Sequence, residues 1–238
     1  MLAADGRVAI YAAPHPGDPL WAFGSAVIGY DAATGEILSR TPPLGLKHGC
    51  WAALTADPRR YGFHATLKAP FRLGDRLDTG HLSEAVRLFG DGMQTLAPFA
   101  LEVRAIGEFL ALVPTSAPDE LQSFAASVVT SFDPFRAPLS DGERERRLAA
   151  GLSERQIGNL EKWGYPYVLE DFRFHMSLTG KIRDATLRNE LKIALAESLH
   201  RETGTTEFTL DALVLFVQRA SGAPFLVHAR HKLNGRAA

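Results

Sequence analysis

The chain has 238 residues, a formal net charge of −1, 46% hydrophobic residues and 22% charged residues. This composition is typical of a globular protein with an ordinary core, and it excludes long disordered tracts. The lack of a basic surplus argues against a surface that coats long nucleic acids, while a local basic pocket stays open. The single cysteine, Cys50, excludes an internal disulfide, and no spacing of ligand residues predicts a metal site.

Nothing in the sequence predicts a membrane or export signal. The first five residues contain no basic segment followed by an apolar run. No stretch approaches the ~20 apolar residues that a membrane span needs. We therefore expect a cytoplasmic protein without membrane association, without a cofactor and without an obligate protein partner.

Strands and helices are predicted to alternate through the first half of the chain. In chain order we predict a strand (7–13), an apolar helix or strand (20–30), a turn (31–35), a second strand (61–71), an amphipathic helix (79–96) and one or two strands around Gly107 (99–113). Pro14 and Pro70 are expected to close the two strands, because proline cannot donate a ladder hydrogen bond.

The second half opens with the most helical part of the chain. We predict one helix over 118–132 and two more within 140–163, with Ser153 and Gln156 placed to form a capping box. A strand (172–179), a long helix capped by Asp184 and ended by Gly204, and a hairpin of strands 208–217 and 224–233 follow. A histidine-containing strand precedes a helix and further strands in both halves. This pattern predicts two similar α+β lobes, with a helical segment at about 118–163.

Three histidines stand two residues before a serine or threonine: His64, His81 and His175. The bare pattern is weak evidence, because a chain with eight histidines meets it by chance. His81 follows a glycine at the predicted start of a helix, where it or Ser83 would serve the helix terminus. The other two lie in predicted strands, so these two are the candidates for catalysis.

Side chains alternate across a strand, so each histidine strand is predicted to have one polar and one apolar face. On the first strand the polar face holds His64, Thr66 and Lys68, with Arg60 continuing it. On the second strand the polar face holds Arg173, His175, Ser177 and Thr179. Such groups are costly to bury without partners. We therefore expect the two polar faces to turn toward each other and line a cationic cleft.

A cleft of this kind suits cleavage of a phosphodiester without a metal. One neutral imidazole can take a proton from the attacking oxygen, and the other, protonated, can give one to the leaving oxygen. Thr66 and Ser177 can donate hydrogen bonds to the non-bridging oxygens as charge develops there. Lys68 or Arg173 would neutralise the phosphate.

The segments around the two histidines resemble the two-histidine phosphoesterase superfamily, which includes RNA 2′-5′ ligase-like proteins and cyclic nucleotide phosphodiesterases. The resemblance rests on His64-Ala65-Thr66-Leu67 and His175-Met176-Ser177-Leu178, and it extends over 59–71, 163–167 and 172–180. These longer segments look like a branch labelled as phosphonate-metabolism proteins. The resemblance implies one catalytic domain over 1–238, built from two pseudo-symmetric lobes that face across a central groove. It also implies an antiparallel sheet with helices in each lobe, and catalysis without a metal.

The predicted catalytic residues are His64, Thr66, His175 and Ser177, and the predicted substrate-binding residues are Tyr11, Arg60, Lys68, Arg173 and Tyr165. We expect ring opening of a small cyclic phosphodiester, either a ribose cyclic phosphate or a nucleoside 2′,3′-cyclic phosphate, in phosphonate metabolism. Two alternatives stay open: processing of RNA ends with a 2′,3′-cyclic phosphate or a 2′-5′ linkage, and a module that binds a phosphorylated ligand without turnover. The charged run 143–147 is expected to be a solvated helix face, unless Arg144 and Arg147 reach over the groove.

Overall fold

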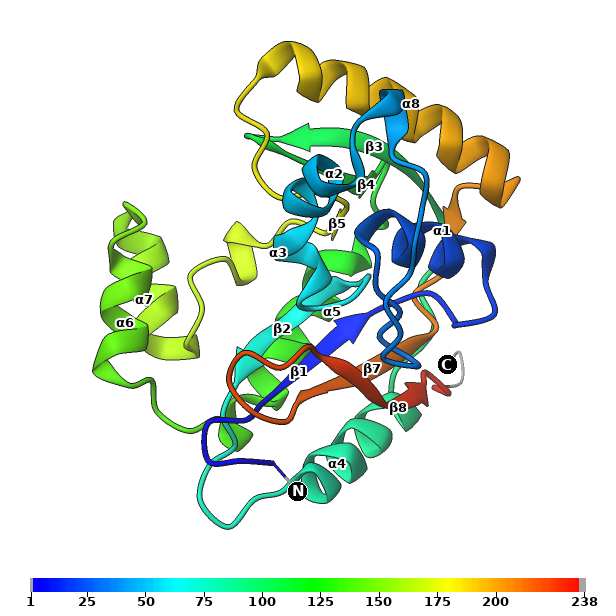
Figure 1. Cartoon of the computed structure of the whole chain (residues 1–238). Coiled ribbons are helices and arrows are strands. Elements are labelled where there is room, and N and C mark those ends of the chain that lie inside the picture. The colour runs from blue at the N-terminus through cyan, green and yellow to red at the C-terminus, as the bar shows by residue number, and fades with distance from the viewer. Residues whose placement is uncertain (1, 236–238) are drawn as a thin grey trace.

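An eight-stranded antiparallel sheet forms the centre of the computed structural model, which describes residues 2–235 (Figure 1). The strands lie in the order β6-β3-β4-β5-β2-β1-β7-β8. Their bounds are β1 Arg7–Ala12, β2 Ala65–Phe71, β3 Phe99–Ile106, β4 Phe109–Pro114, β5 Met176–Ser177, β6 Glu207–Phe208, β7 Ala212–Gln218 and β8 Leu226–Lys232. Met1 and residues 236–238, which the predicted domain includes, lie outside the described residues.

The two histidine motifs meet in the middle of this sheet. The inner strands β2 and β5 pair antiparallel through Ala65 and Met176. The sheet then continues outward through β1, β7 and β8 on one side and through β4, β3 and β6 on the other. This arrangement confirms the predicted α+β class with antiparallel halves. Because the halves join edge to edge, the two motifs lie on neighbouring strands.

Helices cover the sheet and extend beyond one side of it. Their bounds are α1 Pro19–Ile28, α2 His48–Leu54, α3 Ala56–Arg59, α4 Thr79–Asp91, α5 Glu120–Ser131, α6 Asp141–Leu148, α7 Glu154–Trp163 and α8 Ala185–Thr203, with short 3-10 helices η1 Pro43–Gly45, η2 Asp133–Phe135 and η3 Leu169–Asp171. In Figure 1, α8 runs along the top of the molecule against β3, and α4 lies at the bottom against β7 and β8. Helices α6 and α7 project at the left as the α6–α7 arm. Within residues 2–235, none of these helices has the length and apolar character of a membrane span.

Local capping residues explain where several predicted helices begin and end. The Asp184 side chain accepts two backbone hydrogen bonds at the start of α8, and Gly204 ends that helix in the left-handed conformation that suits glycine. At the start of α7, Ser153 and Gln156 form the predicted capping box. The apolar segment 20–30, which the sequence leaves open between helix and strand, belongs mostly to helix α1.

The predicted strand over 172–179 is wrong for most of its length. Within this segment Met176–Ser177 pairs as β5, whereas Phe172 and Phe174 are buried in the core outside any strand. Alternating apolar residues report which side chains are buried, and an extended segment can bury them without ladder hydrogen bonds. The first motif strand is also shorter than predicted and starts at Ala65. Helices α2 and α3, which precede it, are absent from the prediction.

Candidate active site

The residues predicted to be catalytic share one face of the central strand pair. Ala65 of β2 lies opposite Met176 of β5, and both side chains are fully buried. Because side chains alternate along a strand, the residues on either side of this pair point to the opposite face. The structure thereby brings together the four predicted residues, which line one cleft: His64, Thr66, His175 and Ser177.

Both imidazoles are oriented by the same kind of backbone contact. The Nδ1 atom of His64 lies 2.9 Å from the Gly62 carbonyl oxygen, and Nδ1 of His175 lies 2.8 Å from the Arg173 carbonyl oxygen. Since a carbonyl oxygen can only accept, each Nδ1 carries a proton, and in the neutral form each Nε2 keeps its lone pair. The Thr66 hydroxyl, 3.1 Å from Nε2 of His64, donates to that lone pair.

Gly62 permits the turn that positions His64. Its φ of +81° lies in the left-handed region, and a Cβ at this position would lie 2.5 Å from the Cβ of Ala32. A residue with a side chain would therefore be strained and sterically blocked. The glycine thus allows the chain to present the carbonyl oxygen that accepts from His64.

Burial makes both imidazoles harder to protonate. It lowers the pKa of His64 from 6.5 to about 3, against the hydrogen bond to Gly62, and the nearby His175 contributes to the lowering. Burial also lowers the pKa of His175. Both imidazoles line the same cleft, from the paired strands β2 and β5. His64 is the imidazole held more firmly in its neutral form.

Tyr11 lies directly against His64 in the cleft. The two rings stack with their centres 3.6 Å apart, because Tyr11 of β1 pairs with Thr66 of β2. The Tyr11 hydroxyl is fully buried and has no hydrogen-bond partner within the described part of the chain. Burial raises the pKa of this hydroxyl well above its usual value, so it stays protonated. A buried, unpaired donor beside a histidine is a feature that a ligand would satisfy.

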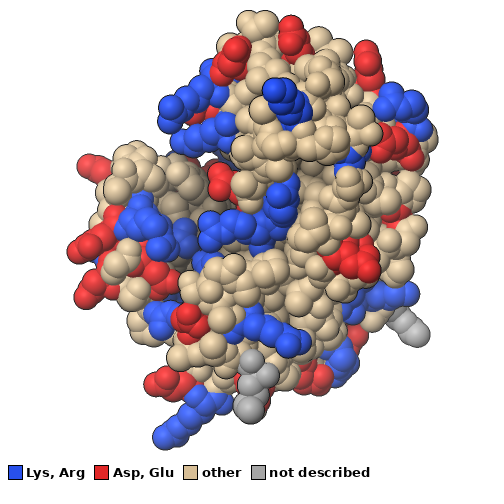
Figure 2. All heavy atoms as spheres, viewed as in Figure 1, with Lys and Arg blue, Asp and Glu red and all other residues tan. Residues whose placement is uncertain are grey.

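The cleft has a volume of about 460 Å³, a size suited to a small phosphorylated molecule. Besides the residues above, its lining includes the aromatic residues Tyr61, Phe109 and Tyr165, the cations Arg7, Arg147 and Lys181, and the carboxylate Asp57. Figure 2 shows Lys and Arg side chains gathered in the hollow between the α6–α7 arm and the body of the molecule. The cleft is therefore cationic, as predicted, in a chain whose net charge is −1.

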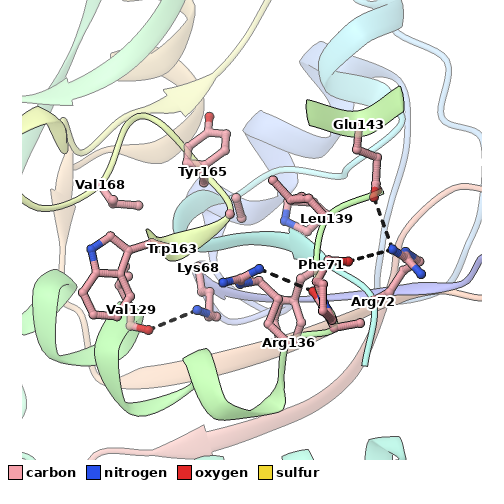
Figure 3. Close-up of a pocket in the computed structure, with 15 residues that line it drawn as sticks. Lys68, Phe71, Arg72, Val129, Arg136, Leu139, Glu143, Trp163, Tyr165 and Val168 are labelled. Atoms are coloured by element: carbon pink, nitrogen blue, oxygen red, sulfur yellow. Dashed lines mark hydrogen bonds and ion pairs between the residues drawn. The ribbon is translucent and has the colours of Figure 1, made fainter. Parts of the chain in front are cut away.

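The prediction that Lys68 faces this cleft is wrong. Its ammonium group is buried, donates to the Val129 carbonyl oxygen at 3.0 Å (Figure 3), and pairs with Asp133 at 3.2 Å. The register of β2 against β1 shifts by one residue between Thr66 and Lys68. Such an irregularity interrupts the alternation of side chains along the strand. Lys68 consequently anchors α5 and η2 to the sheet.

The other two cations predicted to bind substrate, Arg173 and Arg60, also lie outside the cleft lining. The Arg173 guanidinium turns back and donates to the carbonyl oxygens of Glu170 and Phe172. The residues just before His175 are outside the ladder, so strand alternation does not govern them. Arg60 is exposed at the end of α3. By contrast, the predicted Tyr11 and Tyr165 both line the cleft.

The cleft takes its cations from residues outside the two predicted polar faces. Sequence reasoning does not identify Arg7 or Lys181. For Arg7 a signal exists, because β1 pairs in unbroken register with β7, and regular alternation places Arg7 on the Tyr11 face. Of the two arginines in 143–147 that are candidates to reach over the groove, Arg147 lines the cleft. The other, Arg144, pairs with Glu161 instead.

The donor set of the cleft suits acid–base chemistry on a phosphate. Two imidazoles, a serine, two threonines and three tyrosines line the same space as the cations. Among residues 2–235, no group of three His, Cys, Asp or Glu side chains is arranged to hold a metal ion.

Comparison with known proteins identifies the family. Residues 66–226 match the family described as "Protein of unknown function (DUF1045)", and the chain belongs to this family. Two similar curated proteins carry the name "Ribose 1,5-bisphosphate phosphokinase PhnN". The one from Janthinobacterium sp. (strain Marseille) is 36% identical over 97% of this chain and 51% of its own length, and the one from Laribacter hongkongensis (strain HLHK9) is 32% identical over 92% and 50%. The chain thus spans about half the length of these relatives.

Two solved structures are similar at low sequence identity. Usb1 from Kluyveromyces marxianus is 11% identical, with a TM-score of 0.39 over 95% of this chain and 99% of that one. The conserved protein of unknown function ATU0111 from Agrobacterium tumefaciens str. C58 is 11% identical, with a TM-score of 0.46 over 94% of this chain and 85% of that one.

Proposed function

We propose that the protein is a phosphodiesterase that opens a small cyclic phosphodiester by acid–base catalysis from His64 and His175, without a metal. The pairing of the two histidine strands carries this proposal. It puts two imidazoles on one face of the sheet, each with its Nδ1 held by a carbonyl oxygen and a hydroxyl two residues further on. A module that only holds a phosphorylated ligand has no need of such a pair.

In the proposed reaction, water attacks the phosphorus of the cyclic diester. His64, whose pKa is lowered to about 3, takes the water proton at Nε2. His175, protonated at Nε2, gives its proton to the leaving sugar oxygen. One P–O bond to the water oxygen forms and one P–O bond of the ring breaks, which leaves a phosphate monoester and a free sugar hydroxyl. The anionic substrate raises the pKa of the nearby imidazoles, which favours a protonated His175.

Hydroxyl donors would stabilise the charge that develops on the non-bridging oxygens. Thr66 and Ser177 stand beside the imidazoles on the same face, and the buried Tyr11 hydroxyl is an unpaired donor in the same cleft. Donors that are already in place are effective because the reaction does not have to reorganise them. The two motif strands supply no cation, since Lys68 and Arg173 are engaged elsewhere.

A ribose cyclic phosphate or a nucleoside 2′,3′-cyclic phosphate is the proposed substrate class. The name of the two relatives contains a ribose bisphosphate, and ring opening of a cyclic phosphodiester on ribose yields a ribose phosphate. We assign the kinase activity in that name to the half of the relatives that this chain does not match. The chain itself contains no G-x-x-x-x-G-K-S/T phosphate-binding loop. The resemblance to phosphonate-metabolism proteins suggests the metabolic setting.

RNA-end processing is the second candidate function. Tyr61, Phe109 and Tyr165 line the cleft, and aromatic side chains can stack on the bases of an RNA with a 2′,3′-cyclic end or a 2′-5′ linkage. The net charge of −1 disfavours a long RNA, because binding of the backbone depends on many cations.

A side-by-side assay of ribose cyclic phosphates, mononucleoside 2′,3′-cyclic phosphates and short RNAs with cyclic ends tests the proposal. Ring opening, followed by phosphorus NMR, should be fastest with a small cyclic phosphate and should be slowed by on the order of 10²–10⁴-fold in H64A and in H175A. A preference for RNA that grows with length and falls steeply with salt would favour the second candidate. Absence of turnover with every substrate, or turnover that survives the loss of both histidines, would overturn the proposal.

A further inference from the structure

Arg147 brings into the cleft a positive charge that forms no ion pair with a described residue. It lies on α6, and its guanidinium Nε is buried without a hydrogen-bond partner or ion pair in the described part of the chain. The other arginines of this helix behave as surface residues: Arg144 pairs with Glu161, and Arg146 is exposed. Burying a guanidinium nitrogen without a hydrogen-bond partner is costly. A bound anion would offset that cost.

The α6–α7 arm holds Arg147 at the cleft. Its guanidinium carbon lies 5.0 Å from the ring centre of Tyr165, and both side chains line the cleft together with the histidines. The N-terminal turn of α6 is tied to the residue after β2 by the ion pair of Arg72 with Glu143, at 3.4 Å (Figure 3). The anchored helix and the contact with Tyr165 therefore hold Arg147 at the cleft, while its Nε has no hydrogen-bond partner among the described residues.

Arg7 is a second guanidinium of the cleft that is fixed in advance. Its Nε donates to the side-chain oxygen of Gln218 at 2.8 Å. Gln218 is buried and in turn donates to the Ala223 carbonyl oxygen at 2.7 Å. Because the buried glutamine engages Nε alone, the two terminal nitrogens of Arg7 remain available as donors.

The two arginines enter the cleft beside its tyrosines. The Arg147 guanidinium lies against the ring of Tyr165, and Arg7 lies on the same face of β1 as Tyr11. Tyr11 in turn stacks on His64. A group bound by the arginines would therefore adjoin the reacting phosphorus, which would lie between the imidazoles.

The positive charge of the cleft exceeds what one phosphodiester would neutralise. Its lining holds three cations, Arg7, Arg147 and Lys181, against one carboxylate, Asp57. A cyclic phosphodiester carries a single negative charge. A second anionic group on the same substrate would balance the remainder.

We propose that Arg147 and Arg7 form a second anion subsite that binds a phosphate monoester of the substrate, separate from the phosphodiester that reacts. This inference rests on the proposed function for the place of the reacting group, and it narrows the substrate to a sugar cyclic phosphodiester that carries a further phosphate. Guanidinium groups suit the task, because their planar donors match two oxygens of a phosphate at once.

Binding of ribose 5-phosphate, measured by calorimetry with ribose as the uncharged control, tests the subsite without any turnover. The wild-type protein and R146Q should bind the phosphate alike, because Arg146 is the exposed neighbour on the same helix. R147Q should bind it roughly 10- to 100-fold more weakly, the effect of losing a charged hydrogen-bond donor. The melting temperature of R147Q is the control for its fold, because this variant also loses the contact of the guanidinium with Tyr165.

The histidine variant H64A/H175A separates the subsite from the reaction. Retained binding of ribose 5-phosphate in this variant would support a separate subsite, whether or not any cyclic phosphodiester is ever turned over. Equal binding in R147Q and R146Q, no binding to the wild-type protein, or loss of binding in H64A/H175A alone would overturn the subsite. In turnover assays, the preference for a ribose cyclic phosphate with a 5-phosphate over one without it should shrink in R147Q and persist in R146Q.

Discussion

The two histidine motifs repeat one local design in two different settings. In both motifs a buried phenylalanine precedes the histidine, and Nδ1 donates to the carbonyl oxygen two residues before. The first motif runs into the seven-residue strand β2, and its imidazole stacks on Tyr11. The second runs into the two-residue strand β5, and its imidazole lies 5.8 Å from the ring of Phe109.

The local motif orients each imidazole in the same way, whereas the surroundings of the ring set its pKa. Both rings present Nε2 in the same way. The pKa of His64 nevertheless falls to about 3, while that of His175 is lowered less far. We therefore propose that His64, in the more deeply embedded motif, is the base and that His175 is the acid. This assignment of roles predicts different responses of the two motifs to substitution, leaving group and pH.

Removal of either imidazole should have the largest effect. H64A and H175A should each lower kcat/KM for a cyclic phosphodiester by on the order of 10²–10⁴-fold, because each removes one proton-transfer group. H81A is the matched control: His81 stands in the same His-x-Ser pattern, but it pairs with Asp78 at the surface. A wild-type rate is expected for H81A. A near-normal rate in either motif variant would contradict the acid–base pair.

A change of leaving group should separate the two roles. A p-nitrophenyl phosphodiester releases an anion that needs no proton, so the acid becomes dispensable while the base does not. H175A should recover on this substrate by about 10²-fold relative to H64A, as measured by release of p-nitrophenol. Recovery of the rate in H64A alone would make His64 the acid and His175 the base. Equal recovery in both variants would contradict separate roles for the two histidines.

Removal of either motif hydroxyl should lower the rate nearly as much as removal of an imidazole. T66V and S177A should each lower kcat by on the order of 10²-fold, the usual cost of removing one donor to a developing oxyanion. The variants should differ in one respect. The Thr66 hydroxyl also donates to Nε2 of His64, so T66V should shift the acid limb of the pH profile, which His64 sets, and S177A should not. Unchanged rates in both variants would remove the hydroxyls from the mechanism.

The pH dependence should follow the acid, His175. The base has a pKa of about 3 and is already neutral at any higher pH. Burial lowers the pKa of His175 below 6.5, so the protonated acid is lost as pH rises through that value. The kcat/KM profile should consequently fall by about tenfold per pH unit on its alkaline side. A rate that rises through neutral pH would contradict the assignment of roles.

Chelation should have no effect at all. The two motif strands supply the acid, the base and the oxyanion donors of the proposed reaction, so the rate in EDTA should equal the rate in buffer. Restoration of a lost rate by a divalent cation, after complete loss on chelation, would show that both motifs serve a different chemistry.

The sequence by itself determined the parts of this protein that depend on neighbours along the chain. Capping residues such as Ser153 and Asp184 define helix starts, because they satisfy backbone groups within one turn. The two histidine motifs are recognisable because each is a short run of consecutive residues. Within each motif, the contact from Nδ1 to a carbonyl oxygen spans only two residues. Alternation along the motifs also predicts correctly that Phe63 and Phe174 are buried.

Only the tertiary structure decided which charges enter the cleft. An irregularity in the pairing of β2 with β1 directs Lys68 to Asp133, and a side chain of the α6–α7 arm, Arg147, takes a place that strand alternation assigns to the motif strands. Neither result is encoded in local spacing. Strand register and the position of a helical arm depend on contacts between residues far apart in the sequence, and these form only when the sheet and its helices pack together.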